Sequence, residues 1–444
     1  MRWWDGVAES AWSPNIRAKD DQRVGMWNSL RGALVATALI GCHAWLPMAP
    51  GGLPPTARLR TQCAETYRMM VVQGENLVCG SGSPLWSRRT AVASAAFAPA
   101  LLTAPVPSAA SAGQLIKLGG DKGIAVPEMG VGAWSWGDQD TWAYGTIKGA
   151  SQESVEAAFR ACVSGGITFV DTAEIYGGGL SETLVGQLLA AGSPAAEREK
   201  IQVATKFYPY DPSTGGTRAR TAAELLPALD ASLKRLQMSS VDLYQIHGPG
   251  LDADGAEIGR ALAEAVKSGR AKAVGVSNFA LSELVPVYRA LEKQGIPLAS
   301  NQIEVSLLRQ IPLSSGLVDA CRDLGVGVLA YSPLAMGRLT GKYDSKTNKA
   351  PGGRSFGRSP PGTLDKLLPV MREIGRNHGG KTPAQVALNW LICQGVVPIP
   401  GAKNAQQAAD NAGALGWRLA DDEVQALASL GYGGRTSVWQ HDGT

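Results

Sequence analysis

The sequence predicts a (β/α)8 barrel over residues 114–444, preceded by a segment of different composition over residues 1–113. Two observations lead to this α/β fold class. Short apolar runs alternate with segments whose apolar residues recur every three or four positions, in eight strand-and-helix units. The first strand also lacks the following Gly-x-Gly-x-x-Gly turn with which an open doubly wound sheet binds a nucleotide. Closure into a barrel is therefore favoured.

Residues 1–113 are rich in Arg, Ala and Ser, and between residues 22 and 113 the acidic residues are Glu65 and Glu75. This composition is typical of a targeting segment, so we expect a largely unstructured presequence. A solvated tail without an address is the alternative, and it would leave the chain in the cytoplasm. The stretch 94–99, SAAFAP, resembles the cleavage junction of algal plastid signals, whereas the arginine pair at 88–89 resembles a signal for the thylakoid lumen.

The barrel elements follow in order from residue 114. The first stretch predicts a small β-hairpin with Gly119 and Gly120 at its turn, leading into the first strand. Apolar runs predict the other seven strands, and apolar spacing of three and four predicts helices between them. The strands are expected at 167–173, 201–207, 241–247, 271–279, 297–305, 325–334 and 395–403, with helices such as 151–166, 220–238 and 254–269.

Composition excludes several classes of function. The formal net charge is +4 and no dense run of Lys or Arg occurs, so a nucleic-acid partner is not expected. Six cysteines without C-x-x-C spacing and only four histidines predict neither a metal site nor a disulfide framework. The apolar run at 31–46 is short and suits a signal peptide, so no membrane span is expected in the mature protein.

Titratable side chains stand at the carboxyl ends of three consecutive predicted strands. They are Asp171, Lys206 and His247, and Tyr176 lies one short turn beyond Asp171. Each alone has an ordinary structural explanation, as turn chemistry or as a core residue. Catalytic groups of a (β/α)8 barrel come from these strand ends, so their coincidence predicts one active site.

These four residue types together suit the reduction of a carbonyl group. A tyrosine phenol, with an ordinary pKa of about 10, can donate a proton if a neighbouring ammonium lowers that pKa. Asp171 would keep Lys206 charged, and His247 would orient the carbonyl oxygen. An isomerase or lyase that uses Lys206 in a Schiff base is a second possibility, although Tyr176 would then have no role.

Seven motifs resemble those of the aldo-keto reductase family, and among its branches they are most similar to the plastid pyridoxal reductases. The resemblance covers essentially all of residues 114–444. The motifs lie at 169–177, 203–207, 241–247, 273–279, 300–308, 330–343 and 398–415. It implies that Asp171, Tyr176, Lys206 and His247 form the catalytic tetrad, and that NADPH delivers a hydride directly to the carbonyl carbon.

The resemblance also implies cofactor contacts. Ser277, Asn278 and Gln302 match the residues that hold the carboxamide, and Tyr331 matches the ring that stacks on the nicotinamide. The pyrophosphate segment is matched by Ser332, Leu334, Gly337 and Arg338. Further expected contacts are Gly132, Ala133, Trp134, Asp171, Gly401, Lys403, Gln407 and Asn411.

Two departures from the family pattern affect specificity. Gln407 stands where an arginine is common, but Lys403 beside a short helix still favours NADPH over NADH. Gly248 stands where many relatives carry a large residue, which predicts a wider substrate pocket walled by Trp134, Trp136 or Trp142. The Gly- and Pro-rich loop 342–362 is expected either to close over the pocket or to be an ordinary solvated loop.

The sequence therefore predicts an NADP-dependent reductase of an aldehyde or ketone, with pyridoxal as one possible substrate. A regulatory protein on the same fold, resembling the potassium-channel β subunits, is the alternative. Because plastid NADPH belongs to the stroma, the stroma is favoured over the thylakoid lumen as the final compartment. The sequence carries no signal for an oligomeric state.

Overall fold

The computed structural model describes residues 114–147, 149–191, 198–343 and 359–433, and these contain a parallel barrel of eight strands. The strands follow one another around the barrel in chain order, from β3 to β10. A bridge between Gly132 and Gly401 joins the first strand to the segment that directly follows the last, and the Gly132 N–H donates to the carbonyl of Pro400 at 3.0 Å. The sheet thus closes on itself, which confirms the predicted fold class.

Each barrel strand lies within, or directly after, the apolar run that predicted it. The first and last strands are shortest, because the chain there soon leaves the ladder for the loops at the barrel mouth. The strands are β3 Val131–Gly132, β4 Phe169–Asp171, β5 Gln202–Phe207, β6 Val241–Ile246, β7 Ala271–Ser277, β8 Leu298–Glu304, β9 Gly327–Tyr331 and β10 Val397–Pro398.

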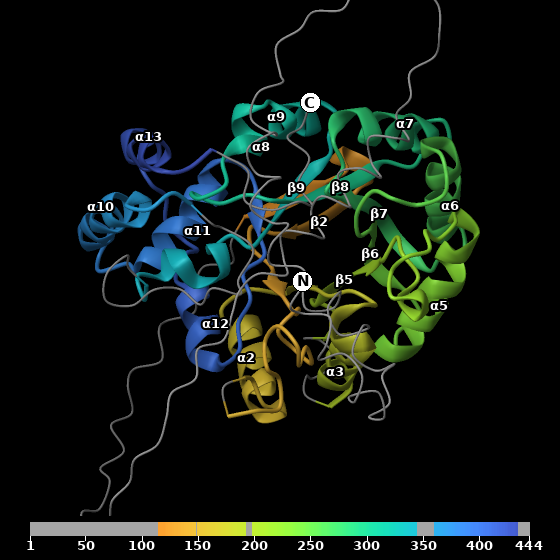
Figure 1. The fold of residues 1–444 in the computed structure, drawn as a ribbon, viewed down its shortest axis with the longest axis horizontal. Coiled ribbons are helices and arrows are strands. Elements are labelled where there is room, and N and C mark those ends of the chain that lie inside the picture. The colour runs from red at the N-terminus through yellow and green to blue at the C-terminus, as the bar shows by residue number, and fades with distance from the viewer. Residues whose placement is uncertain (1–113, 148, 192–197, 344–358, 434–444) are drawn as a thin grey trace, which may run out of the picture. The chain divides into compact units, whose positions relative to one another are not determined.

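Helices surround the strands as an outer ring (Figure 1). Several begin at the residues that sequence rules favour for a helix start: Ser151, Asp254 and Thr382 each accept a hydrogen bond from a first-turn N–H within a capping box. The α-helices are α2 Gln152–Ser164, α3 Leu180–Ala191, α5 Leu225–Leu236, α6 Gly255–Lys267, α7 Leu281–Glu292, α8 Ile311–Ser314, α9 Leu317–Asp323, α10 Thr363–Asn377, α11 Pro383–Cys393, α12 Ala405–Ala412 and α13 Asp421–Leu430. None of the helices among the described residues is both long and apolar enough to cross a membrane.

The predicted N-terminal hairpin is present and closes one end of the barrel. Its strands, β1 Leu115–Leu118 and β2 Ile124–Pro127, pair antiparallel around a 3-10 turn. Leu118 and Val126 are fully buried against the inward-facing apolar residues of the barrel strands. The partners in this inner cluster are Phe169, Ala204, Leu243, Ala273, Ala299, Leu329, Val397 and Ile399.

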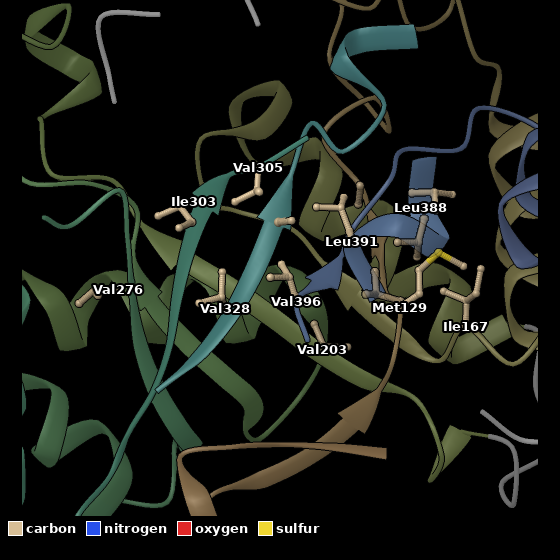
Figure 2. Close-up of a cluster of buried hydrophobic side chains, with 14 of the residues drawn as sticks. Met129, Ile167, Val203, Val276, Ile303, Val305, Val328, Leu388, Leu391 and Val396 are labelled. Atoms are coloured by element: carbon tan, nitrogen blue, oxygen red, sulfur yellow. The ribbon is translucent and has the colours of Figure 1, made fainter. Parts of the chain in front are cut away.

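A second, larger hydrophobic cluster joins the outer face of the barrel to the helices. Figure 2 shows part of it, in which Leu388 and Leu391 of α11 join Val203, Val276 and Val328 of the strands. All five side chains are at most 5% exposed. Burial of aliphatic side chains on this scale is the main favourable contribution to holding the helices on the barrel.

Inside the barrel, polarity changes along several of the strands. Side chains two residues apart point to the same face of a strand. On several strands the next residue on the inward face, two positions after the apolar layer, is polar. These pairs are Phe169 and Asp171, Ala204 and Lys206, and Leu243 and Gln245. A buried polar layer thus stands above the apolar layer, at the carboxyl ends of the strands.

Two predicted features lie outside the described residues. The predicted targeting segment occupies residues 1–113, and most of the predicted closing loop falls in residues 344–358.

Candidate active site

The polar layer is centred on a buried ion pair between neighbouring strands. Nζ of Lys206 on β5 lies 2.5 Å from Oδ1 of Asp171 on β4, and the two side chains are 0% and 2% exposed. The same ammonium donates to the carbonyl oxygen of Thr172 at 2.9 Å. Because a buried charge is tolerated only when paired and hydrogen-bonded, these contacts fix the position of the lysine.

The second carboxylate oxygen of Asp171 is held by side chains of two further strands, β8 and β6. Its Oδ2 accepts hydrogen bonds from Nε2 of Gln302 at 2.8 Å and from Nε2 of Gln245 at 3.4 Å. Oγ of Ser300 donates to Oε1 of Gln245. A Cβ at Gly275 would lie 2.2 Å from that Ser300 oxygen, so only glycine leaves room for this chain of hydrogen bonds.

Tyr176 and His247 complete the group. The Tyr176 hydroxyl lies 3.4 Å from Nζ of Lys206 and 3.4 Å from Nε2 of His247. The two rings meet edge to face with centroids 5.4 Å apart. The structure therefore brings the four residues of the predicted tetrad together around one phenolic oxygen.

A glycine turn delivers Tyr176 to this position. The tyrosine opens a 3-10 segment, Tyr176–Gly179, and all three of its glycines have positive φ. At Gly177, with φ of 57°, a Cβ would lie 2.4 Å from the carbonyl oxygen of Gly137. The turn therefore packs directly on the loop that follows β3, which is possible only without a side chain.

Burial controls the protonation of the site. It raises the pKa of the Tyr176 phenol well above its ordinary value of 10.0, and the carboxylates of Asp171 and Asp138 add to the rise. The predicted lowering of the Tyr176 pKa is therefore wrong in its net direction, because this pKa is raised although Nζ of Lys206 lies 3.4 Å from the phenol oxygen. Burial also lowers the pKa of Lys206 itself, against the opposing effect of the Asp171 carboxylate.

His247 is a neutral imidazole at neutral pH. Burial, followed by the positive charge of Lys206, lowers its pKa well below 6.5. Its Nδ1 is buried with no hydrogen-bond partner in the described structure, while Nε2 faces the Tyr176 hydroxyl. Nε2 of the imidazole and the phenol oxygen can therefore contact the same ligand atom.

A cavity of about 740 Å³ opens above these residues. Most of the predicted cofactor contacts line it, together with Asp171, Tyr176 and His247 of the tetrad. The predicted contacts in its wall, besides Asp171, are Gly132, Trp134, Ser277, Asn278, Gln302, Tyr331, Ser332, Leu334, Gly337, Gly401, Lys403, Gln407 and Asn411.

Three predicted site residues do not reach the cavity wall. Ala133 is fully buried, Arg338 is 8% exposed and donates to the carbonyl of Ala335 at 3.2 Å, and Lys206 lies behind Tyr176. Of the candidate wall tryptophans, Trp136 is buried in the core, where its Nε1 donates to the carbonyl of Ala402 at 2.7 Å. Trp134 and Trp142 do line the cavity.

Gly248 leaves the cavity open beside His247. It belongs to the wall, and a Cβ added there would meet no atom within 4 Å. The space that a larger residue would fill is therefore free, as the sequence predicted. Tyr208 stands nearby and meets the His247 ring edge to face at 6.0 Å.

Strained backbone gathers on the far side of the cavity. Asn278, Ser332 and Met336 all have positive φ without being glycine, at 59°, 49° and 52°. All three line the cavity. Non-glycine residues in this region are uncommon and concentrate at binding sites, so the backbone here is shaped for a ligand. The Tyr331 hydroxyl donates to Oδ1 of Asn278 at 2.9 Å, which fixes the aromatic ring beside them.

The amino end of α12 forms the outer rim of the cavity. Asn404 caps the helix by accepting from the N–H of Gln407, and Oε1 of Gln407 accepts from the N–H of Lys403, both at 2.9 Å. Nζ of Lys403 lies 4.4 Å from the centre of the Trp142 ring. A helix amino end with a lysine beside it can hold an anionic group.

Several wall and support residues were not predicted. Gln245 and Ser300, which support Asp171, stand out in the sequence only as polar residues inside apolar strands, two positions before His247 and Gln302 respectively. Most of the other wall residues lie within the motifs at 330–343 and 398–415, although the sequence did not single them out as contacts. The unpredicted wall residues are Ser135, Gly149, Ser154, Tyr208, Pro209, Pro333, Met336, Thr340, Lys342, Tyr343, Ala384, Ile399, Pro400, Asn404 and Asp410.

Metal chemistry has no site in the part of the chain that the structure describes. Among those residues, no group of three or more His, Cys, Asp or Glu side chains could hold a metal ion. The described cysteines, Cys162, Cys321 and Cys393, are free thiols.

Comparison with known proteins places these features in a family. The model of the aldo/keto reductase family matches residues 128–431. The chain is 36% identical over 325 residues to the chloroplastic pyridoxal reductase of Arabidopsis thaliana, covering 71% of this chain and 85% of that protein. It is 31% identical over 338 residues to L-glyceraldehyde 3-phosphate reductase of Escherichia coli K12, covering 72% and 93%.

A solved structure shares the fold. The aldo-keto reductase of Klebsiella pneumoniae in complex with NADPH superposes with a TM-score of 0.56 at 26% sequence identity, covering 74% of this chain and 99% of that one.

Proposed function

The chain belongs to the aldo/keto reductase family, and we propose that it reduces an aldehyde or ketone to the alcohol with NADPH. The observation that carries the proposal is the position of the Tyr176 hydroxyl at the cavity floor, 3.4 Å from both Lys206 Nζ and His247 Nε2. A protonated phenol between a cation and a neutral imidazole is suited to give a proton to a carbonyl oxygen.

The residues of the cavity fit NADPH. Lys403 and the amino end of α12 would take the 2′-phosphate, Tyr331 would meet the nicotinamide ring, and Ser277 and Asn278 would hold its carboxamide. Oγ of Ser135 is buried in the cavity wall without a hydrogen-bond partner in the described structure, which leaves a polar group for a ligand to satisfy. When bound, NADPH supplies the hydride that reduces the carbonyl carbon.

The residues of this chain handle the proton. Nε2 of His247 orients the carbonyl oxygen toward Tyr176, and the phenol gives its proton to that oxygen as negative charge develops there. Lys206 then faces the phenolate left behind, 3.4 Å from its oxygen. Asp171, held by Gln302 and Gln245, keeps the ammonium in place. The raised pKa of Tyr176 keeps the donor protonated throughout the neutral pH range.

Pyridoxal is the specific substrate that we propose to test first. The chloroplastic relative is named a pyridoxal reductase. The free space beside Gly248 and the aromatic wall of Trp134, Trp142 and Tyr208 suit a flat ring that carries an aldehyde. Small aldehydes remain the competing class.

The test is turnover by the purified full chain. NADPH consumption is followed against pyridoxal, small aliphatic aldehydes, aromatic aldehydes and ketones, with NADH as the control cofactor. We expect reduction of at least one carbonyl class with NADPH, faster than with NADH. Tight NADPH binding without reduction of any carbonyl would reject the enzyme and support a regulatory role like that of the potassium-channel β subunits.

A Schiff-base mechanism on Lys206 is disfavoured by the contacts of the lysine. Its nitrogen donates to Asp171 and Thr172 and lies behind Tyr176, away from the cavity wall, so a carbonyl carbon cannot approach it. Borohydride should therefore trap no carbonyl compound on Lys206. A covalent adduct found there by mass spectrometry would favour an isomerase or lyase.

We also propose that the protein works in the plastid stroma. The composition of residues 1–113 and the chloroplastic relative support this location. Imaging a fusion of residues 1–113 to a fluorescent protein tests the address. Fluorescence that stays in the cytoplasm would reject it.

A further inference from the structure

A buried carboxylate without a predicted role stands in the loop after β3. Asp138 is 7% exposed. Its Oδ2 accepts from Nε1 of Trp134 at 2.8 Å, and its Oδ1 accepts from the backbone N–H groups of Thr141 at 2.7 Å and Trp142 at 3.2 Å. Three N–H donors therefore converge on one carboxylate and fold the loop around it.

Both tryptophans bonded to Asp138 line the cavity, Trp134 through its indole N–H and Trp142 through its backbone N–H. The Trp134 ring lies nearly parallel to Tyr176, with centroids 6.1 Å apart and an interplanar angle of 29°. Trp142 meets Trp134 edge to face at 5.5 Å, and the Lys403 ammonium lies 4.4 Å from the Trp142 ring. A continuous chain of contacts thus runs from the tyrosine to the lysine.

We propose that Asp138 is a positioning residue that holds Trp134 against Tyr176 and Trp142 against Lys403, and so sets the carbonyl pocket and the cofactor rim together. The inference rests on the proposed reductase function. It assigns to Asp138 a role that acts through the two tryptophans and the local field rather than through contact with the substrate.

Only a carboxylate satisfies this arrangement. Both of its oxygens accept, and all three neighbours donate. An amide at the same position would present an NH2 group either to Trp134 or to the two backbone N–H groups, whichever way it turned. Either the Trp134 indole N–H or the two backbone N–H groups would then face an NH2 donor instead of an acceptor. Those buried N–H groups would be left without a hydrogen bond, which is destabilising.

Charge gives a second consequence, at Tyr176. The titratable groups that face its phenol are Lys206, His247, Asp171 and Asp138, and the two carboxylates both raise its pKa. Removing the charge of Asp138 should lower that pKa. Because the phenol must be protonated to give a proton, the alkaline limb of the turnover profile should move to lower pH.

The experiment compares two charge-matched variants of the full chain. Asp138→Asn removes the buried carboxylate, and Asp140→Asn removes an exposed one from the same loop. For Asp138→Asn we expect the KM for the carbonyl to rise roughly tenfold or more, as loss of a hydrogen bond to a buried charge implies. We also expect its alkaline limb to shift to lower pH. Asp140→Asn should match the unmodified chain in both.

Circular dichroism provides a readout that does not depend on turnover. Trp134 and Trp142 are close enough to couple in the far ultraviolet, and Trp142→Phe identifies their shared signal. That signal should fall in Asp138→Asn and persist in Asp140→Asn. If the unmodified chain reduces no carbonyl, the proposed function fails while this measurement still tests the placement of the tryptophans.

The result that overturns the inference is equally specific. The inference fails if Asp138→Asn keeps the tryptophan signal, the KM and the pH profile of the unmodified chain. It also fails if the variant loses activity only in proportion to its folded fraction. A double-variant cycle with Trp134→Phe adds a second check. If Asp138 acts through the indole N–H, the two effects on KM should not add. Full additivity would count against the role.

Discussion

Nζ of Lys206 and Oδ1 of Asp171 lie 2.5 Å apart at the centre of the barrel, and neither side chain is more than 2% exposed. The pair stands directly above the apolar layer that closes the barrel. The pair therefore contributes both to the stability of the barrel and to the proposed activity. Variants of these residues and of their neighbours should separate the effect on stability from the effect on turnover.

Tyr176→Phe removes the proton donor and keeps the ring. We expect turnover to fall by about 10²–10⁴-fold, the range for a positioned general acid, while NADPH affinity changes little. Steady-state turnover and a fluorescence titration of NADPH measure the two quantities. Unchanged turnover would reject Tyr176 as the acid.

Lys206→Met leaves the Asp171 carboxylate buried without its cation. Breaking one partner from a buried ion pair costs about 3–5 kcal/mol in the free energy of unfolding. Denaturant titration of the variant should show this loss, together with loss of turnover. The double variant Lys206→Met, Asp171→Asn should recover part of the stability but not the activity. A double variant as unstable as the single one would contradict the interpretation.

His247 predicts how stability depends on pH. Its folded pKa is depressed below 6.5, so the unfolded chain binds a proton there before the folded chain does. The contribution of neutral His247 to the free energy of unfolding is fully present above about pH 6.5. It is lost as the pH falls toward the folded pKa, at up to about 1.4 kcal/mol per pH unit. Free energies of unfolding measured from about pH 7 to about pH 5 should show a shallower fall in His247→Gln than in the unmodified chain. An equal slope in both proteins would exclude His247 as the source.

Gln407→Arg should strengthen the preference for NADPH. Gln407 now bonds the backbone of Lys403, and the lysine is a point charge without bidentate geometry. An arginine at the first turn of α12 would add two donors for a 2′-phosphate. The ratio of kcat/KM for NADPH to that for NADH should rise, and Lys403→Ala should lower it. If neither variant changes this ratio, the 2′-phosphate does not bind at Lys403 and Gln407.

Gly248→Leu should narrow the substrate range. The added side chain would enter the free space beside His247. We expect kcat/KM to fall roughly tenfold or more for ring-bearing aldehydes and to change little for small aliphatic ones, because a filled pocket excludes by size. Gly248→Ala is the milder control. Equal losses for both classes of substrate would show that Gly248 does not control access.

Long-range contacts explain which site residues could be predicted. Asp171, Lys206 and His247 each end an apolar run, and in a parallel barrel all such ends meet at one rim, so their proximity follows from the strand pattern. Gln302 bonds Asp171 across 131 residues of sequence. Gln302 was predicted through family resemblance as a cofactor contact, but its hydrogen bond to Asp171 becomes visible only when the barrel closes.

The sequence by itself predicted the eight strands, the hairpin and the four tetrad residues, because apolar runs and the residues at or just beyond their ends are local properties of the chain. Tertiary structure alone decided that Trp136 packs in the core while Trp134 and Trp142 line the cavity, and that Asp138 accepts from the indole N–H of Trp134 and the backbone N–H of Trp142. It also decided the direction of the Tyr176 pKa. That direction depends on how completely water is removed from the phenol and which charges surround it, and burial is a property of the folded barrel rather than of any segment.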